Sequence, residues 1–435
     1  MVHALWIALL VLSVASPGAA AADWGGLVGF DLDYLGENYY QELDLPLSDL
    51  TDAESGLLES SVTRLVDDVW LGGQRLDLFW RSAPGAALSL DLESSTLNNA
   101  ERFGQELRAR GSRRAAGGVW TLDVQGHVRD EERSLVGGGD WRTAVRGRHR
   151  RALSSSWSTE IEAGWERSRT LGDTTTFIYD YDTARARVGV EAGEGWLPVW
   201  DAHVEGVRKD VAGGLAGSYT EVSAGGVRRT AAGRGWTFDL EGRSRNYDVN
   251  GDVGSDFLEA DLDVLGRPLH GHEHALIVEA EVSVSDFTEE DDLYYDYARF
   301  TVYPGWEWKT GAWSARFGPR ARILRDTGGG DHDYRQWTVR AETGRTLGAL
   351  GYFHLSLDAG ARDYRSSDTE VITVDAVSAS FIRSDFRLLD VLLLADLPLP
   401  AGFAFRILAD TTLELHDGGE RVHITFGTAS LVRTF

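Results

Sequence analysis

The sequence predicts an all-β protein, a transmembrane up-and-down antiparallel β-barrel of about 18–20 strands, with long loops on one rim and short turns on the other. Three observations support this prediction. Apolar and polar residues alternate with period two over most of the chain, the connections alternate in length, and tryptophans lie near the ends of the alternating stretches. Such a sheet has one apolar and one polar face, and closure leaves no strand edge unpaired.

Residues 272–308 show the alternation most clearly. In the first half, a mostly acidic or small polar set that includes Glu279 and Glu281 alternates with an apolar set. That apolar set is Leu276, Val278, Ala280, Val282 and Val284. The segment 288–292, TEEDD, is too polar to pack and is followed by a second alternating stretch. We therefore expect a β-hairpin of two long strands with one apolar face.

The same pattern recurs along the chain from Gly85. The predicted strands cover residues 86–93, 101–110, 119–129, 141–151, 157–169, 181–191, 196–208, 218–229, 236–247, 256–265, 272–287, 293–308, 313–324, 334–343, 351–364, 370–384, 401–415 and 420–435. These make about 18 strands, and adding 62–71 and 76–80 gives about 20; either even number puts both termini on the rim with short turns. The longer connections recur about every 35–40 residues, as expected for hairpins of constant height.

The two faces of the predicted strands differ in the way that a membrane barrel requires. Phe238 and Leu240 share one face, whereas Asp239, Glu241 and Arg243 share the other. A soluble sandwich also alternates, but its strands are usually shorter than these stretches. Amphipathic tryptophan rings near strand ends would form girdles at the headgroup level, although aromatic residues at the edge of a sandwich are an alternative. The tryptophans concerned are Trp120, Trp141, Trp157, Trp196, Trp236, Trp306, Trp308, Trp313 and Trp337.

The N-terminal segment 1–22 predicts a cleavable export signal. Its apolar run 4–14 is too short to span a bilayer, and Ala20 to Ala22 offer a small-residue cleavage site before Asp23. The first residues hold His3 but no Lys or Arg, so a buried N-terminal helix is the alternative. The chain has no Cys, which excludes disulfides, and its formal net charge of −25 argues against nucleic acid as a partner.

Two regions depart from the regular pattern. We expect residues 23–60 to form a periplasmic segment, a plug or an extra strand, and the barrel to occupy 61–435; 27–35 is one candidate strand. Within 23–60, the acidic, leucine-dotted part 36–60 is the candidate plug. Residues 384–399 contain FRLLDVLLLADL, which suits either a short amphipathic helix on the short-turn rim or an extended strand.

The C-terminus carries a resemblance to a known class. The chain ends in Phe435, and Leu431 is in phase with it, although Arg433 interrupts the apolar face. Three earlier apolar residues lie on the opposite phase, so we expect a bulge near Gly427. These residues are Val422, Ile424 and Phe426. In its terminal aromatic and its hairpin pattern the chain resembles bacterial outer-membrane β-barrels of the porin type, without pointing to a specific family. The resemblance implies the outer membrane of a Gram-negative-type bacterium.

The polar faces supply the candidate lumen residues. Arg142, Arg146, Arg148 and Arg150 share one strand face, and Glu160, Glu162 and Glu166 share a face of the next strand. Paired antiparallel, they would form an Arg–Glu ladder. The ladder would either create a transverse field for solutes or simply satisfy its own charges. The remaining candidates are Asp239, Glu241, Arg243, Glu279, Glu281, Asp358 and Arg362.

Two further sets of polar residues suggest metal or cation binding. His270, His272 and His274 form an H-x-H-x-H row that we expect on one strand face, where residues i and i+2 could bind a metal; polar tips at a strand start are the alternative. The acidic residues 289–292, with Asp331 and Asp333, could hold divalent cations beside lipid phosphates or be a solvated loop. We predict no metal site, no cofactor and, because no catalytic motif appears, no enzyme activity.

The sequence therefore predicts a porin-like channel in contact with outer-membrane lipid, through which small hydrophilic solutes pass. The alternative is a structural sheath that holds a periplasmic protein, as porin–cytochrome conduits do. Single-channel conductance separates the two hypotheses, because only the channel gives steady currents by itself.

Overall fold

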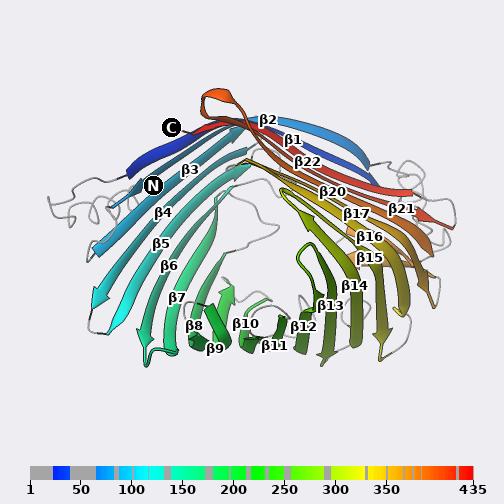
Figure 1. The fold of residues 1–435 in the computed structure, drawn as a ribbon, viewed down its shortest axis with the longest axis horizontal. Helices are drawn as coiled ribbons and strands as arrows, with labels where there is room; N and C mark the ends of the chain where they lie inside the picture. The colour runs from blue at the N-terminus through cyan, green and yellow to red at the C-terminus, as the bar shows by residue number, and fades with distance from the viewer. Residues whose placement is uncertain are drawn as a thin grey trace, which may run out of the picture.

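The wall of the molecule is built almost entirely from β-strands (Figure 1). The computed structural model describes residues 23–39, 65–82, 88–99, 102–115, 117–131, 139–171, 180–194, 197–211, 217–230, 235–248, 256–288, 295–328, 332–348, 351–365, 368–374, 377–383, 385–417 and 421–434. Among these residues, no helix is both long and apolar enough to cross a membrane.

The strands follow one another with few other elements between them. In chain order they are β1 (Asp23–Tyr39), β2 (Leu65–Arg81), β3 (Leu88–Asn99), β4 (Arg102–Ala115), β5 (Gly118–Glu131), β6 (Gly139–Ala152), β7 (Trp157–Leu171), β8 (Tyr181–Glu194), β9 (Leu197–Val211), β10 (Tyr219–Arg229), β11 (Trp236–Tyr247), β12 (Phe257–His270), β13 (His274–Phe287), β14 (Tyr297–Thr310), β15 (Trp313–Asp326), β16 (Tyr334–Leu347), β17 (Gly351–Tyr364), β18 (Asp368–Val374), β19 (Val377–Arg383), β20 (Phe386–Pro398), β21 (Phe403–His416) and β22 (Arg421–Thr434). A 3₁₀ turn, η3 (Pro400–Gly402), joins β20 to β21.

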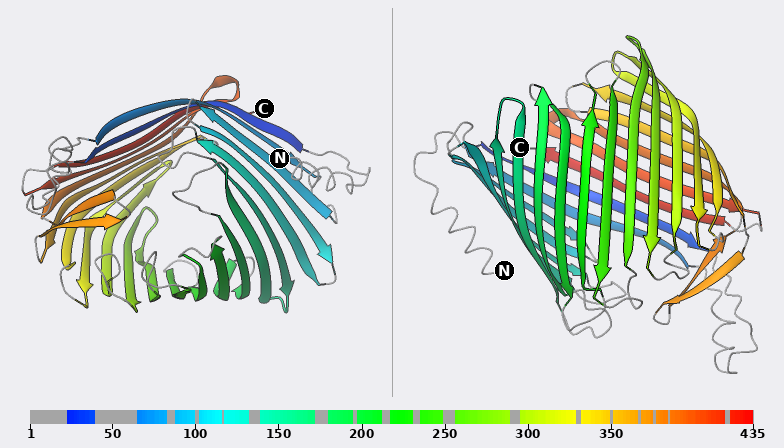
Figure 2. Two further views of the ribbon diagram at one scale, coloured as in Figure 1. Left: turned by 180° about the vertical axis from the view of Figure 1, so that it is seen from behind. Right: turned by 90° about the horizontal axis from the view of Figure 1, so that it is seen from below.

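The main sheet is an up-and-down antiparallel barrel, as predicted. It holds 20 strands of the described chain. Each strand pairs with the next along the chain, except that β17 pairs with β20. The sheet closes because β22 pairs antiparallel with β1 from Leu27 to Asn38. The sheet curves around a central opening, and β1, β2 and β22 lie side by side in it (Figures 1 and 2).

The connections alternate between the two rims. We call the rim where β1 begins and β22 ends the terminal rim, and the opposite one the loop rim. On the terminal rim, β14 ends at Thr310 and β15 starts at Trp313; Gly311 allows this tight turn because its φ is +54°. On the loop rim, β15 ends at Asp326 and β16 starts at Tyr334.

The N-terminal part of the barrel differs in detail from the prediction. Residues 62–71 and 76–80 were expected to be two strands, but 65–81 form the single strand β2 of 17 residues. The candidate strand 27–35 lies within β1, which also has 17 residues. The predicted total of about 20 strands is therefore reached with β1 and one strand β2, and not with two strands between residues 62 and 80. Residues 1–22 and 40–64 lie outside the described chain, so the export signal and the plug stay predictions.

The segment before the last two barrel strands corrects a second expectation. The stretch 370–384 was predicted to be one barrel strand, but its described residues belong to β18 and β19, a separate two-stranded sheet that projects from the loop rim (Figure 2). The barrel strand is β20, so the helical alternative for 384–399 is wrong. Asp390 and Asp396 are an even number of residues apart, which puts both on one face of a strand.

The last strand also differs from expectation. β22 pairs with β21 from Arg421 to Arg433 without a register shift, so the bulge expected near Gly427 is absent. Phe426 and Leu431 therefore lie on opposite faces of the sheet, with exposures of 42% and 40%. Register shifts occur elsewhere in the described sheet, between Ala192 and Gly193 and in the β12–β13 pair.

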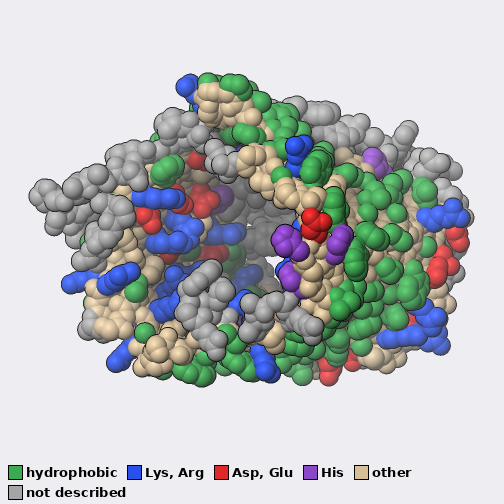
Figure 3. Space-filling view, in the orientation of Figure 1, with side chains coloured by type: hydrophobic (Ala, Val, Ile, Leu, Met, Phe, Trp, Pro, Cys, Tyr) green, Lys and Arg blue, Asp and Glu red, His purple; other side chains and the backbone are tan. Residues whose placement is uncertain are grey.

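The outer face of the barrel is apolar. Ile161, Val188 and Val204 lie directly opposite one another on β7, β8 and β9, and each is more than half exposed. Tryptophans near the terminal rim lie on the same face, among them Trp157 and Trp313, which are 50% and 42% exposed. The space-filling view shows hydrophobic side chains spread over the outside (Figure 3).

Candidate functional site

The inner face of the barrel collects the charged side chains. One row of directly opposed residues shows the principle, because Arg148, Glu162, Arg187 and Glu205 follow one another across β6 to β9. Their chain neighbours Ile161, Val188 and Val204 lie on the outer face, as alternation requires. Lys, Arg, Asp and Glu side chains line the central opening in Figure 3.

By the strand registers, the residues predicted to line the lumen all lie on the same face of the sheet as this row. The set is Arg142, Arg146, Arg148, Arg150, Glu160, Glu162, Glu166, Asp239, Glu241, Arg243, Glu279, Glu281, Asp358 and Arg362. These residues fall into three groups, on β6–β7, on β11 and on β13–β17. The groups differ in how far opposite charges pair.

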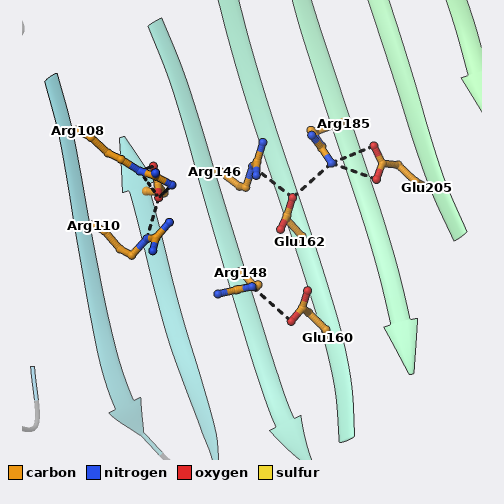
Figure 4. Close-up of polar contacts among 9 residues, drawn as sticks. Arg108, Arg110, Arg146, Arg148, Glu160, Glu162, Arg185 and Glu205 are labelled. Carbon is orange, nitrogen blue, oxygen red and sulfur yellow. Dashed lines mark hydrogen bonds and ion pairs between the residues drawn. The ribbon is translucent and has the colours of Figure 1, made fainter. Parts of the chain in front are cut away.

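The first group forms the Arg–Glu network shown in Figure 4. Glu162 forms an ion pair with Arg146, with Nε 3.3 Å from Oε1, and lies 3.7 Å from Arg185. Arg185 in turn lies 3.1 Å from Glu205 on β9. The expected ladder is therefore made of diagonal contacts between neighbouring strands, and it extends beyond β7 to β9.

In the β6–β7 part of the wall, the arginine side chains are more exposed than the carboxylate side chains with which they pair. The Arg146 side chain is 51% exposed, whereas that of its partner Glu162 is 10% exposed. Arg148 and Glu160 lie 3.8 Å apart, and again the arginine side chain is the more exposed of the two, at 46% against 21%. An Arg side chain is longer and carries its charge at the far end, so a paired wall still presents guanidinium groups to the water.

Further pairs continue this network around the first group. Arg142 lies 3.5 Å from Glu166, and Arg150 pairs with Glu191 of β8. On the other side, Asp123 of β5 accepts from Arg108 and Arg110 of β4 at 2.8 and 2.9 Å. The charged contacts therefore link β6 to β9 in one network, and the Asp123 cluster separately links β4 to β5.

The group on β13–β17 is paired as well, and the arginines in its ion pairs are less exposed than those of the first group. Glu279 lies 2.6 Å from Arg316, and Glu281 lies 2.6 Å from Arg299. Asp358, which is 8% exposed, lies 3.2 Å from Arg320. Arg362 donates to the side-chain oxygen of Gln336 at 2.8 and 3.0 Å.

The strands β11 and β12 carry carboxylates without such pairing. Arg243 pairs with Glu259. In contrast, Asp239 lies directly opposite Asp263, and Glu241 directly opposite Asp261. These four carboxylates form no ion pair with a residue in the described part of the chain. Like charges directly opposite each other in a sheet are destabilising, so this acidic quartet (Asp239, Glu241, Asp261 and Asp263) marks a place where the wall keeps negative charge.

The three histidines do not share a strand face. His270 ends β12, His274 begins β13, and His272 lies in the turn between them. The turn changes the direction of the chain, so spacing along one strand no longer relates the three rings. His274 lies near Trp306, with ring centroids 5.6 Å apart. No group of three His, Asp or Glu residues in the described ranges is placed to hold a metal ion.

One of the loop carboxylates has a structural partner. Asp333 accepts from Arg325 at 2.6 Å and from the backbone N–H of Asp326 at 2.8 Å. Burial opposes ionisation, but these hydrogen bonds and that of Arg365 keep the pKa of Asp333 below its usual value. Asp333 thus closes the β15–β16 loop. Residues 289–292 and Asp331 lie outside the described chain.

Sequence reasoning omitted several residues of the inner wall. They include Asp123, Arg185, Glu205, Asp261, Asp263, Arg316, Arg320 and Arg340. The signal that could have found them is the same period-two phase, because each lies on the polar face of a stretch already predicted to be a strand. Which of them meet could not be read from the sequence, since diagonal contacts depend on the register between strands.

Comparisons with known proteins returned structures but no sequence family. No family model matches the chain, and no curated protein matches it. The BenF-like porin from Pseudomonas fluorescens Pf-5 is similar over 95% of this chain and 99% of that one, with 9% identity and a TM-score of 0.45. Pseudomonas aeruginosa OpdQ gives 10% identity and a TM-score of 0.48, covering 95% and 98% of the two chains. OccK1 (OpdK) of the same species gives 12% identity and a TM-score of 0.48, and the similarity covers 95% of this chain and 98% of that one. At these identities and TM-scores, function has to be inferred from the side chains of this chain itself.

Proposed function

We propose that the chain is a porin-like channel of the outer membrane of a Gram-negative-type bacterium, through which small hydrophilic solutes pass passively. Membrane lipid contacts the outside of the barrel, and water and solutes fill the charged lumen. The proposal assigns no catalytic step to the chain.

One observation carries the proposal, namely the opposite character of the two faces of one wall. Ile161, Val188 and Val204 form an outward row that is more than half exposed, and the charged Glu162 and Arg187 lie beside them on the inward face. Exposing such a belt to water costs about 25 cal/mol per Å² of apolar surface, a cost that lipid removes. A soluble barrel normally has the reverse arrangement, with its apolar face inside.

The strand number supports an aqueous lumen. For a round barrel of 20 strands, a strand spacing of about 4.8 Å and a tilt of about 40° give a backbone diameter of roughly 40 Å. Barrels of about 16–18 strands already enclose water-filled channels. Inner side chains such as Arg146 and Arg148 are 51% and 46% exposed, so they remain accessible to water in this space.

Conductance of the purified chain in planar lipid bilayers tests the proposal. We expect stepwise, steady currents that scale with salt concentration, because the inner wall is wet and charged. A preparation refolded from denaturant serves as the control for contaminating channels. Absence of current would contradict the channel, and if another protein co-purified in that case, the sheath would become the better explanation.

A further inference from the structure

A recess in the inner wall lies next to the acidic quartet. Its volume is about 330 Å³, and it spans the strands from β11 to β16. Asp239, Asp263 and Glu281, which lie directly opposite one another on β11, β12 and β13, line one side of it. Tyr303, Arg320 and Arg340 line the other side. The recess therefore brings carboxylates, guanidinium groups and one phenol together on the lumen wall.

Most charges in the recess already have partners. Glu281 lies 2.6 Å from Arg299, and Arg320 lies 3.2 Å from Asp358. Arg340 lies 2.6 Å from Glu342. Asp239 and Asp263, in contrast, have neither an ion pair nor a hydrogen bond to a residue that the structure describes. The uncompensated charge of the recess is therefore negative.

The phenol of Tyr303 supplies a second, independent observation. Tyr303 is 2% exposed, and its hydroxyl has no hydrogen-bond partner among the described residues. The ring lies against Gly305, where an added Cβ would come within 2.8 Å of two ring carbons. A buried hydroxyl without a partner is destabilising, and a donor bound in the recess would remove that cost. The hydroxyl can accept one hydrogen bond and donate another.

We propose that this recess is a binding subsite for small organic cations that carry a primary ammonium group. Such a group is a compact charge with three donors, which matches two carboxylates and one phenol oxygen. Asp239 and Asp263 would balance its charge, and Tyr303 would accept the third hydrogen bond. A bound metal ion fits less well, because no group of three His, Asp or Glu residues within the described ranges is placed to hold one.

The subsite rests on the proposed channel function and names a solute class for it. The carboxylates belong to the lumen wall, so a cation that binds there lies in the path of the current. Occupancy should therefore interrupt conduction, as expected for a solute that binds and leaves during passage. A cation bound here would also relieve the repulsion between Asp239 and Asp263.

Block of the single-channel current by n-butylammonium chloride tests this inference. We expect wild-type protein to be blocked in a concentration-dependent manner. The double variant Asp239→Asn with Asp263→Asn should bind about tenfold more weakly or worse, because it loses charge-assisted hydrogen bonds. Tyr303→Phe should weaken the block about threefold and leave the KCl reversal potential unchanged, since it removes no charge. Asp182→Asn, on the outer face beside Arg167, is the matched control and should behave as wild type.

The outcomes separate the subsite from the channel. Currents that butylammonium blocks equally in wild type and in both recess variants would overturn the subsite and leave the channel intact. An unchanged block in Tyr303→Phe alone would overturn the built site in favour of a general negative field. Stronger block by Mg²⁺ than by butylammonium, lost in the double variant, would replace the organic cation with a metal ion. No current from any preparation would contradict the channel itself. Identical heat-dependent gel mobility shows that the variants are folded.

Discussion

The outer face offers the sharpest test of the membrane orientation, through the change Val188→Arg. Val188 is 57% exposed and lies between Ile161 and Val204 on the neighbouring strands, which are 56% and 55% exposed. β8 has 14 residues. With a rise of about 3.3 Å per residue and a tilt of about 40°, each residue adds about 2.5 Å of height. Val188 then lies about 18 Å from the start of β8, close to the middle of a belt about 25 Å tall.

The depth of the substitution sets its expected cost. An arginine at the midplane of the lipid-facing surface destabilises a barrel by about 2–4 kcal/mol, whereas one near the interface costs about 0–1 kcal/mol. Ala184 is exposed on the same face of β8 and lies about 10 Å closer to the loop rim. Ala184→Arg is therefore the matched control for charge and side-chain size, and Val188→Leu is the control for position.

Reversible guanidinium unfolding in lipid vesicles, followed by tryptophan fluorescence, measures the difference. We expect Val188→Arg to lower the ratio of folded to unfolded protein roughly 30- to 700-fold, and both controls to stay within about fivefold of wild type. Equal and small effects of the two arginines would refute the reasoning, because they would mean that the row with Ile161 and Val204 does not face hydrocarbon.

Two further predictions concern charged groups. Glu162→Gln should leave Arg146 and Arg185 without their shared carboxylate, so the KCl reversal potential should shift toward anions, while the unfolding free energy changes by no more than about 1 kcal/mol. A shift toward cations would contradict this. Because its lowered pKa stabilises the ionised form, Asp333 should hold the β15–β16 loop closed above its unfolded-state value of about 4 and release it as the pH falls further. Hydrogen exchange of that loop, corrected for intrinsic rates, should rise in acid and match that of Asp333→Asn; equal protection at neutral and acidic pH would exclude the contact with Arg325.

The architecture and the two faces could be predicted from the sequence, because alternation is a local property. In β11, the order Phe238, Asp239, Leu240, Glu241 is enough to assign two residues to each face. The same reasoning worked wherever the outer positions were apolar and the inner ones charged. Closure of the barrel also followed from the need to pair every edge in a membrane, but the sequence did not predict that β1 would be the strand that closes it.

The predictions that failed concern segments where the alternation is weak, or where pairing with another strand determines the structure. In β20, apolar residues occupy both faces, with Leu388 and Leu389 adjacent, so the sequence suited a helix as well as a strand. Pairing with β17 and β21 resolves the ambiguity, and that pairing is not local. The β18–β19 hairpin has alternation of its own, so sequence alone could not tell that it pairs only with itself.

The electrostatics of the lumen depended on registers that the sequence does not contain. The sequence predicted an Arg–Glu ladder without assigning partners, and in the structure Arg148 lies opposite Glu162 but forms its ion pair diagonally, with Glu160. The register between β11 and β12 also places Asp239 directly opposite Asp263. A shift of one residue in that register would move the side chains of one strand to the lipid-facing side. Composition could predict that the wall is charged, whereas which charges remain unpaired is decided by the strand registers.

Side-chain length then determines which sign the lumen water meets. In the β6–β7 wall each carboxylate has an arginine partner, yet the guanidinium groups are the more exposed member, as with Arg146 and Glu162. In the β11–β12 wall the exposed groups are unpaired carboxylates, Asp239 and Asp263 among them. A chain of net charge −25 can therefore present positive charge on one part of its lumen and negative charge on the next. A dipolar solute in this lumen would orient its negative end toward the β6–β7 arginines and its positive end toward the β11–β12 carboxylates. A solute with only a positive group would favour the β11–β12 side.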